Sequence, residues 1–279
     1  MKKFFTIAAA ALLTFGLSAC NDTASPTEGS KAEGNSQLTL KEVFEKSIEQ
    51  SGSVESLKAK IDMTQVVEIP SQELSMDMKS KMDMSMTVEP LAIYQKGETL
   101  IVGEENGTQQ MESYMTEDGF YIYEGMSGQW TKLPPEMSEQ MMSLSGQQAD
   151  PSQQLKDLEQ FQDDFKFEHT EKAYILRLSA SGDKFNEFIK NEMEETMPDL
   201  LAGNPGMLEN MDIQKVDYEI YIDKETFNPT RLNMVLEMNI IAEGEELIIK
   251  QDLKSSFSDY NKVDEIKVPQ AVIDSANAL

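Results

Sequence analysis

Apolar and polar residues alternate over an unusually long stretch of the chain, positions 74–88. The apolar residues of this stretch are Leu74, Met76, Met78, Met82, Met84, Met86 and Val88. Side chains of a β-strand point alternately to its two faces, so the pattern predicts one strand with an apolar face and a polar face. At roughly 3.3 Å per residue this strand spans about 50 Å, which exceeds the usual length, and we expect it to bend around a core.

Similar alternation recurs on both sides of this stretch. It covers the ranges 59–69, 216–222, 232–240 and 247–257. Shorter alternating segments lie between them, separated by the turn signals Lys96-Gly97, Asn106-Gly107 and Asp118-Gly119. Consecutive strands joined by short turns pair antiparallel, so the sequence predicts a large antiparallel sheet.

Helical periodicity interrupts these strands in several places. Thr39 and Glu42 have the spacing of a capping box at the start of a predicted helix over 40–50. Further helices are expected to begin at Pro134-Pro135 and Asp150-Pro151 and to cover 185–193. The predicted class is therefore α+β: a strongly curved antiparallel sheet, in effect an incomplete β-barrel, with helices covering its concave face.

The first twenty residues have the order of a bacterial lipoprotein signal. Met1-Lys2-Lys3 is positive, 4–16 is apolar, and Leu17-Ser18-Ala19-Cys20 is a small-residue cleavage site that ends in cysteine. The alternative, an uncleaved membrane helix, is disfavoured because the apolar segment is shorter than the roughly 20 residues needed to cross a bilayer. We expect residues 1–19 to be removed and Cys20 to receive a diacylglycerol, which anchors the protein at the extracytoplasmic face of the bacterial cell membrane.

Two further units are expected after the signal. Residues 20–37 are rich in Ser, Thr, Gly, Glu and Asn and lack apolar periodicity, so they are interpreted as the lipidated N-terminus and a flexible tether. Residues 38–279 contain no second obvious linker and are predicted to form one domain.

Composition excludes several classes of function. The formal net charge is −26, so binding to nucleic acid or anionic lipid through charge is not expected. Cys20 is the only cysteine, which leaves no disulfide, cysteine nucleophile or thiolate metal site once it is lipidated. No phosphate-binding loop, zinc signature or calcium loop is present, and no cofactor or metal is predicted. The single histidine, His169, is interpreted as a satisfied surface residue because no nucleophile motif accompanies it.

Two C-terminal motifs resemble a known family. They are Asp223-Lys224-Glu225-Thr226-Phe227-Asn228-Pro229, and Ser258-Asp259-Tyr260-Asn261 followed by Ile266-Lys267-Val268-Pro269. They resemble the back half of LolA-like and LppX/LprG-like lipoproteins, and the mature chain as a whole resembles an uncharacterised group of bacilli lipoproteins near that fold. The resemblance implies an incomplete barrel that encloses an apolar cavity for acyl chains, and it implies no catalytic residue.

The leading functional hypothesis is a non-enzymatic, membrane-tethered protein that binds a lipid or another hydrophobic ligand. The residues expected to line the ligand are Met76, Met78, Met82, Met84, Met86, Leu232, Met234, Leu236 and Met238. The residues of a possible gate are Leu200, Leu201, Met207 and Leu208. The β-strand methionines could alternatively bind Cu(I), although no His or Cys lies near them in the sequence.

Two alternatives stay open. The chain could be a structural or interaction module of the cell envelope, with a solid core and an unidentified protein partner. It could also be an envelope hydrolase, for which the sequence shows no nucleophile and base. Alternating strands line a pocket or pack against helices with the same period, so the sequence does not decide between them.

Overall fold

The computed structural model describes residues 23–104, 107–148, 151–180, 183–196, 210–242 and 244–279. Within these residues the strands form one 13-stranded sheet in the order β1-β8-β9-β10-β11-β12-β2-β3-β4-β5-β6-β7-β13. The strands are β1 (Ser25–Pro26), β2 (Ser56–Ile69), β3 (Leu74–Thr87), β4 (Ala92–Ile101), β5 (Thr108–Thr116), β6 (Gly119–Glu124), β7 (Gln129–Lys132), β8 (Lys166–His169), β9 (Ala173–Ala180), β10 (Met211–Asp223), β11 (Pro229–Ala242), β12 (Glu245–Ser258) and β13 (Asn277–Ala278). The helices are α1 (Leu40–Ser51), α2 (Pro135–Gln148), α3 (Pro151–Glu159), α4 (Asp183–Thr196) and α6 (Gln270–Ser275), with short 3-10 helices η1 (Pro70–Gln72) and η2 (Gln162–Asp164).

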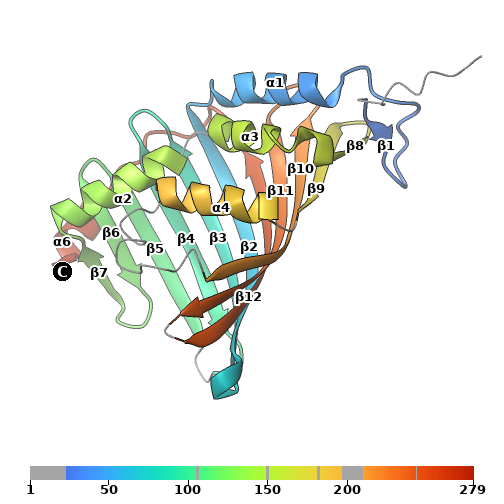
Figure 1. Ribbon diagram of the computed structural model, residues 1–279. Helices are drawn as coiled ribbons and strands as arrows, with labels where there is room; N and C mark the ends of the chain where they lie inside the picture. The colour runs from blue at the N-terminus through green and yellow to red at the C-terminus, as the bar shows by residue number, and fades with distance from the viewer. Residues whose placement is uncertain (1–22, 105–106, 149–150, 181–182, 197–209, 243) are drawn as a thin grey trace, which may run out of the picture.

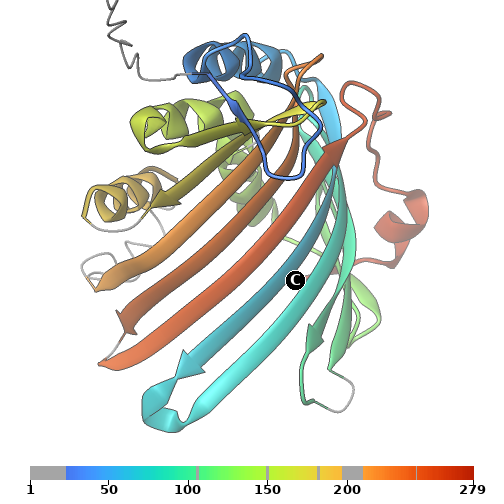
Figure 2. The same cartoon turned by 90° about the vertical axis from the view of Figure 1, so that its right-hand side faces the viewer.

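The sheet is antiparallel from β8 through to β7 and is strongly bent, as Figures 1 and 2 show. Its two outermost strands, β1 and β13, are short and pair in parallel with β8 and β7. They lie at opposite edges and leave the sheet unclosed. This confirms the prediction of a large, curved, incomplete antiparallel barrel.

The long alternating stretch is β3, which ends at Thr87 and so is one residue shorter than predicted. It pairs with β2 over its whole length, from Ser56 opposite Thr87 to Ile69 opposite Leu74. The two strands are joined by η1, which lies at the tip of the sheet in Figure 1. A β-hairpin this long places the methionines of β3 in a single row on one face.

Gly97 lies within β4, so the prediction of a turn at Lys96-Gly97 is wrong. Gly97 pairs with Met82 across the β3–β4 ladder. A Cβ atom at Gly97 would clash with the carbonyl oxygen of Lys81 and would lie 2.6 Å from Cγ of Met82. The glycine therefore allows two strands to approach closely, which is a role of strand glycines that turn propensity does not reveal.

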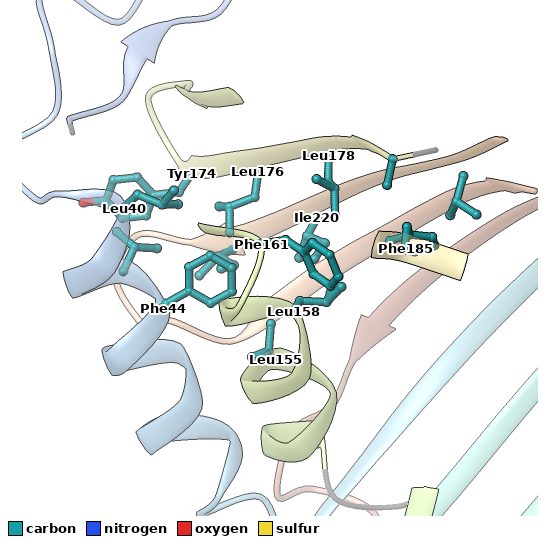
Figure 3. Packing of buried hydrophobic residues seen from close by; sticks show 14 of the residues in the cluster. Leu40, Phe44, Leu155, Leu158, Phe161, Tyr174, Leu176, Leu178, Phe185 and Ile220 are labelled. Carbon is teal, nitrogen blue, oxygen red and sulfur yellow. The ribbon is translucent and has the colours of Figure 1, made fainter. Parts of the chain in front are cut away.

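Helix α1 begins as its sequence predicts. The Thr39 side chain accepts a hydrogen bond from the backbone N–H of Glu42, and the Glu42 carboxylate accepts one from the backbone N–H of Thr39. This capping box orients the helix so that Val43 and Phe44, both 0% exposed, enter the main core. Figure 3 shows Phe44 beside α3, whose Leu155 and Leu158 pack between α1 and the sheet.

Helices lie over one end of the inner face, which we define as the sheet face that contacts α1, α3 and α4. The main core joins these helices to β9 through Leu176 and Leu178 and to β10 through Ile220 (Figure 3). Farther along the sheet, the α2 residue Ser138 accepts a hydrogen bond from the backbone N–H of Phe120 in β6, at 3.3 Å. The opposite strand ends reach beyond the helices (Figure 1).

The other face of the sheet, called the outer face below, carries the C-terminal segment. Val268 and Val272 pack there with Tyr121, and Trp130 and Tyr114 border this small cluster. Figure 2 shows α6 on the side of the sheet opposite α1, α3 and α4. The segment ends in β13, which covers the exposed edge of β7 and so protects that edge from pairing with another chain.

Residues from 23 onward do not form the predicted tether. Ala24 is 0% exposed, and Ser25 and Pro26 pair with β8. The Thr27 hydroxyl donates a 2.9 Å hydrogen bond to the carboxylate of Glu168, 141 residues away. The polar composition that indicated a flexible segment instead supplies side-chain and backbone contacts to the sheet edge. Cys20 lies outside the described residues.

Candidate ligand-binding face

The inner face is uncharged over most of the sheet. The ladder registers place one residue of each cross-strand pair beside the other on the same face, so the composition of each face follows from the pairing. Apolar or neutral polar residues occupy every inner position of eight strands. These strands are β2, β3, β4, β5, β9, β10 and β11, and β12 from Leu247 onward. A wall of this kind favours apolar or uncharged molecules.

A cavity of about 250 Å³ opens in this face between α4 and the sheet. Its lining residues are Ile189 of α4, Met211, Ile213, Val216 and Tyr218 of β10, and Met234, Leu236, Met238 and Ile240 of β11. Tyr218 contributes the only side-chain polar atom of this lining. Its volume is slightly below the roughly 300–1,000 Å³ of typical small-molecule sites, so it suits a small apolar group or one part of a larger molecule.

The four β11 residues predicted to contact a ligand are all half-buried on the inner face. Met234, Leu236 and Met238 line the cavity, whereas Leu232 lies beyond it against the main core. The β10 half of the lining was not selected from the sequence, although Val216, Tyr218 and Ile220 show the same alternation. Alternation alone does not show that β10 pairs with β11. This pairing places Val216 beside Leu236 and Tyr218 beside Met234.

The β3 methionines lie on the same face but not at the cavity. Two strands, β12 and β2, separate β3 from β11, which corresponds to about 15 Å at the usual strand spacing. Met86 is 6% exposed in a separate cluster with Leu57 and Ala59. Met78, Met82 and Met84 are half-buried, and Met76 is 38% exposed. The structure therefore places the two predicted sets on one wall without bringing them into contact.

The predicted gate residues Leu200, Leu201, Met207 and Leu208 lie outside the described residues. In the described part of the chain, no group of three or more His, Cys, Asp or Glu side chains could hold a metal ion. Over the same residues, no helix combines the length and the apolar character required to span a membrane.

The outer face has the opposite chemistry. A hollow of about 580 Å³ lies there, and its lining includes Lys60, Asp62, Lys81, Asp83 and Glu112. The charges are paired across strands: Lys60 lies 3.1 Å from Asp83, and the Lys81–Asp62 distance is 3.9 Å. Although this hollow is larger than the cavity, its ion-paired lining is that of a solvated sheet surface and not that of a site for an apolar ligand.

His169 is buried, at 4% exposed, so its interpretation as a surface residue is wrong. Its Nε2 lies 3.0 Å from the Gly34 carbonyl oxygen, and its Nδ1 lies 2.7 Å from the Lys224 ammonium. The Lys224 ammonium also donates a 2.6 Å hydrogen bond to the carbonyl oxygen of Thr170. Burial holds the pKa of Lys224 below its usual value. The histidine thus fastens residues 23–38 to the sheet, which explains why alternation alone misplaced it.

The fold and its inner face define an α+β protein whose open, curved antiparallel sheet presents an uncharged wall with an apolar cavity. The chain belongs to the family described as "Family of unknown function (DUF6612)", which matches residues 39–277.

Comparisons with other proteins add loose structural likenesses. No curated protein sequence matches the chain. The crystal structure of LprF from Mycobacterium bovis aligns with a TM-score of 0.42 at 10% identity and covers 82% of this chain and 96% of LprF. That of the Mycobacterium tuberculosis lipoprotein LppX aligns with a TM-score of 0.38 at 13% identity, over 82% of this chain and 98% of LppX. Likenesses at these scores carry no conclusion about function.

Proposed function

We propose that this protein is a non-enzymatic lipoprotein, held at the extracytoplasmic face of the cell membrane by a diacylglycerol on Cys20, that binds a lipid or another hydrophobic molecule against its inner face. The observation that carries the proposal is the cavity between α4 and β10–β11, which is lined by apolar side chains within an uncharged wall. A half-buried apolar surface of this kind gains free energy when a hydrophobic ligand removes it from water.

Methionine suits such a wall. The unbranched thioether side chain repacks around apolar partners of different shape, and Met234 and Met238 lie on either side of Leu236 in the cavity lining. The half-buried Met78, Met82 and Met84 extend the same kind of surface across β3. The wall can therefore accommodate a ligand longer than the cavity.

Native mass spectrometry of the mature domain, after exposure to an envelope lipid extract, tests this function. We expect retained lipid in the wild type and at least a tenfold loss in Leu236→Trp, because the indole fills the cavity. Val235→Trp is the matched control, since Val235 directly precedes Leu236 on the same strand with its side chain on the outer face. A lipid-free mass for the wild type at every lipid concentration would overturn the proposal.

The anchor is tested separately. We expect Cys20→Ser to move the protein from the membrane fraction to the soluble fraction of cells. The purified variant should retain lipid as the wild type does, because the cavity is lined by residues of α4, β10 and β11. Membrane association that is unchanged in Cys20→Ser would contradict anchoring at this residue.

A further inference from the structure

Neutral hydrogen-bonding side chains form a band beside the apolar cavity. The band consists of Gln251 of β12, Gln65 of β2, Ser80 of β3, and Thr99 and Gln95 of β4. Gln251 pairs with the cavity residue Leu236 on one side and with Gln65 on the other. Gln65 pairs with Met78, and Ser80 lies two residues farther along β3 and pairs with Thr99. The band therefore begins at the edge of the cavity and crosses the inner face diagonally.

Several side chains of the band have donors and acceptors that are not used within the described part of the protein. The hydroxyls of Ser80 and Thr99 are 2.8 Å apart and bond to each other. No side-chain hydrogen bond joins the amides of Gln65, Gln95 or Gln251 to another of the described residues, and these three residues are half-buried. An amide both donates and accepts, and its partial burial is favourable only if a partner replaces the water that it loses. The band is thus suited to the ester, hydroxyl or amide groups of a ligand.

A charged headgroup has no partner on this wall. No Lys or Arg occupies an inner position of β2, β3, β4, β5, β9, β10 or β11, or of β12 from Leu247 onward. An ionised phosphate placed beside Gln251 would lose water without gaining a counter-ion, and such desolvation is costly. The formal net charge of −26 opposes an anion further.

A ligand larger than the cavity can reach the band. At about 250 Å³ the cavity holds only part of a lipid, so the remainder must lie on neighbouring wall. On the β12 side the cavity is bordered by Leu253, Gln251 and Ile249, and the polar group among these three residues is the amide of Gln251, which is followed by Gln65 on β2.

We infer that the ligand is an uncharged lipid, such as an acylglycerol, whose chain occupies the cavity while its ester or hydroxyl groups bond to the band from Gln251 to Thr99. This inference rests on the proposed function and narrows its ligand class. Phospholipids with the same acyl chains are discriminated against because of their ionised phosphate.

The test is competition between two lipids that differ only in the headgroup. The mature domain is incubated with equal amounts of a diacylglycerol and of the phosphatidylglycerol with identical chains, and native mass spectrometry gives the ratio retained. We expect at least a tenfold preference for diacylglycerol. Equal retention, or a preference for phosphatidylglycerol, would overturn the headgroup inference and leave the binding function standing. Retention of neither lipid, nor of any lipid from an envelope extract, would overturn both.

Variants of the band residues test whether the band causes the preference for diacylglycerol over phosphatidylglycerol. Gln65→Leu combined with Gln251→Leu should lower diacylglycerol retention about tenfold through the loss of two hydrogen bonds. Gln110→Leu is the matched control, because Gln110 is exposed on the outer face of β5 and should leave retention unchanged. Gln251→Lys should raise phosphatidylglycerol retention at least tenfold by supplying a counter-ion. If the first variant folds, as judged by circular dichroism and thermal unfolding, and retains diacylglycerol fully, the band is not the headgroup site.

Discussion

The two ends of β3 carry the same residue type on the same face and yet lie in different environments. Met86, at the end near the helices, is 6% exposed within a buried cluster, whereas Met76, near the η1 tip, is 38% exposed. Leu57 and Ala59 pack beside Met86. Among the described residues, no helix extends over the η1 end of β3 in Figure 1. One strand thus contributes core at one end and open wall at the other, which shows that periodicity determines the face of a residue and not its burial.

The largest effect should come from truncating this strand at its buried end. We expect Met86→Ala to lower the free energy of unfolding by about 2–5 kcal/mol, because it leaves a cavity in a packed cluster. Met76→Ala should change it by less than about 1 kcal/mol, because water already reaches that side chain. Urea unfolding of both variants measures the difference. Equal losses would mean that the η1 end of the sheet is covered in solution.

A second prediction concerns the segment that residues 23–38 form over the sheet edge. Glu168 is buried, which disfavours its charge, but hydrogen bonds from Lys166, Thr27 and Arg177 outweigh this effect and hold its pKa below the usual value. Glu168→Gln should therefore cost about 1–3 kcal/mol of unfolding free energy at pH 7.

The pH dependence of that cost follows from the direction of the shift. A carboxylate with a lowered pKa in the folded state stabilises the fold fully above its unfolded pKa of about 4.3, and this stabilisation is lost as the pH falls through the folded-state value. The difference between wild type and Glu168→Gln should shrink below about pH 4. A difference that is constant from pH 7 to pH 3 would show that the ionised carboxylate does not hold the segment.

The smallest effect is expected on the outer face. Asp83 lies 3.1 Å from Lys60, and both side chains are more than 70% exposed. Asp83→Asn should alter the unfolding free energy by less than about 1 kcal/mol and leave lipid retention unchanged. A large loss of lipid retention in this variant would move the binding site to the outer hollow.

Much of the sheet could be predicted from the sequence, because strand alternation and the Thr39–Glu42 capping box act locally. The β3 stretch is correct to one residue, and α1 begins where its cap indicates. Residues 23–38 could not be placed in this way. Their bonds, such as Thr27 to Glu168, join positions 141 residues apart and leave no periodic pattern.

The candidate site was predictable only in part, for the same reason. Alternation identified Met234, Leu236 and Met238 as inner residues, and they line the cavity. It could not show that Ile189 of α4 would close over them, or that β10 would supply the other half of the lining. The residues on the inner face can be predicted from the local alternation of each strand. The contacts of that face with α4 and β10 depend on the tertiary fold, so alternation does not predict them.

The most direct test of lipid binding at the inner face uses contact quenching. Trp130 is the only tryptophan and lies at an outer position of β7, packed near Tyr114 and Tyr123. Tyr218→Trp combined with Trp130→Phe transfers the fluorophore to the cavity lining. With a lipid brominated along its acyl chain, we predict strong quenching of the tryptophan at position 218 and none of Trp130 in the wild type. Quenching of neither tryptophan, or of Trp130 alone, would contradict binding in the cavity.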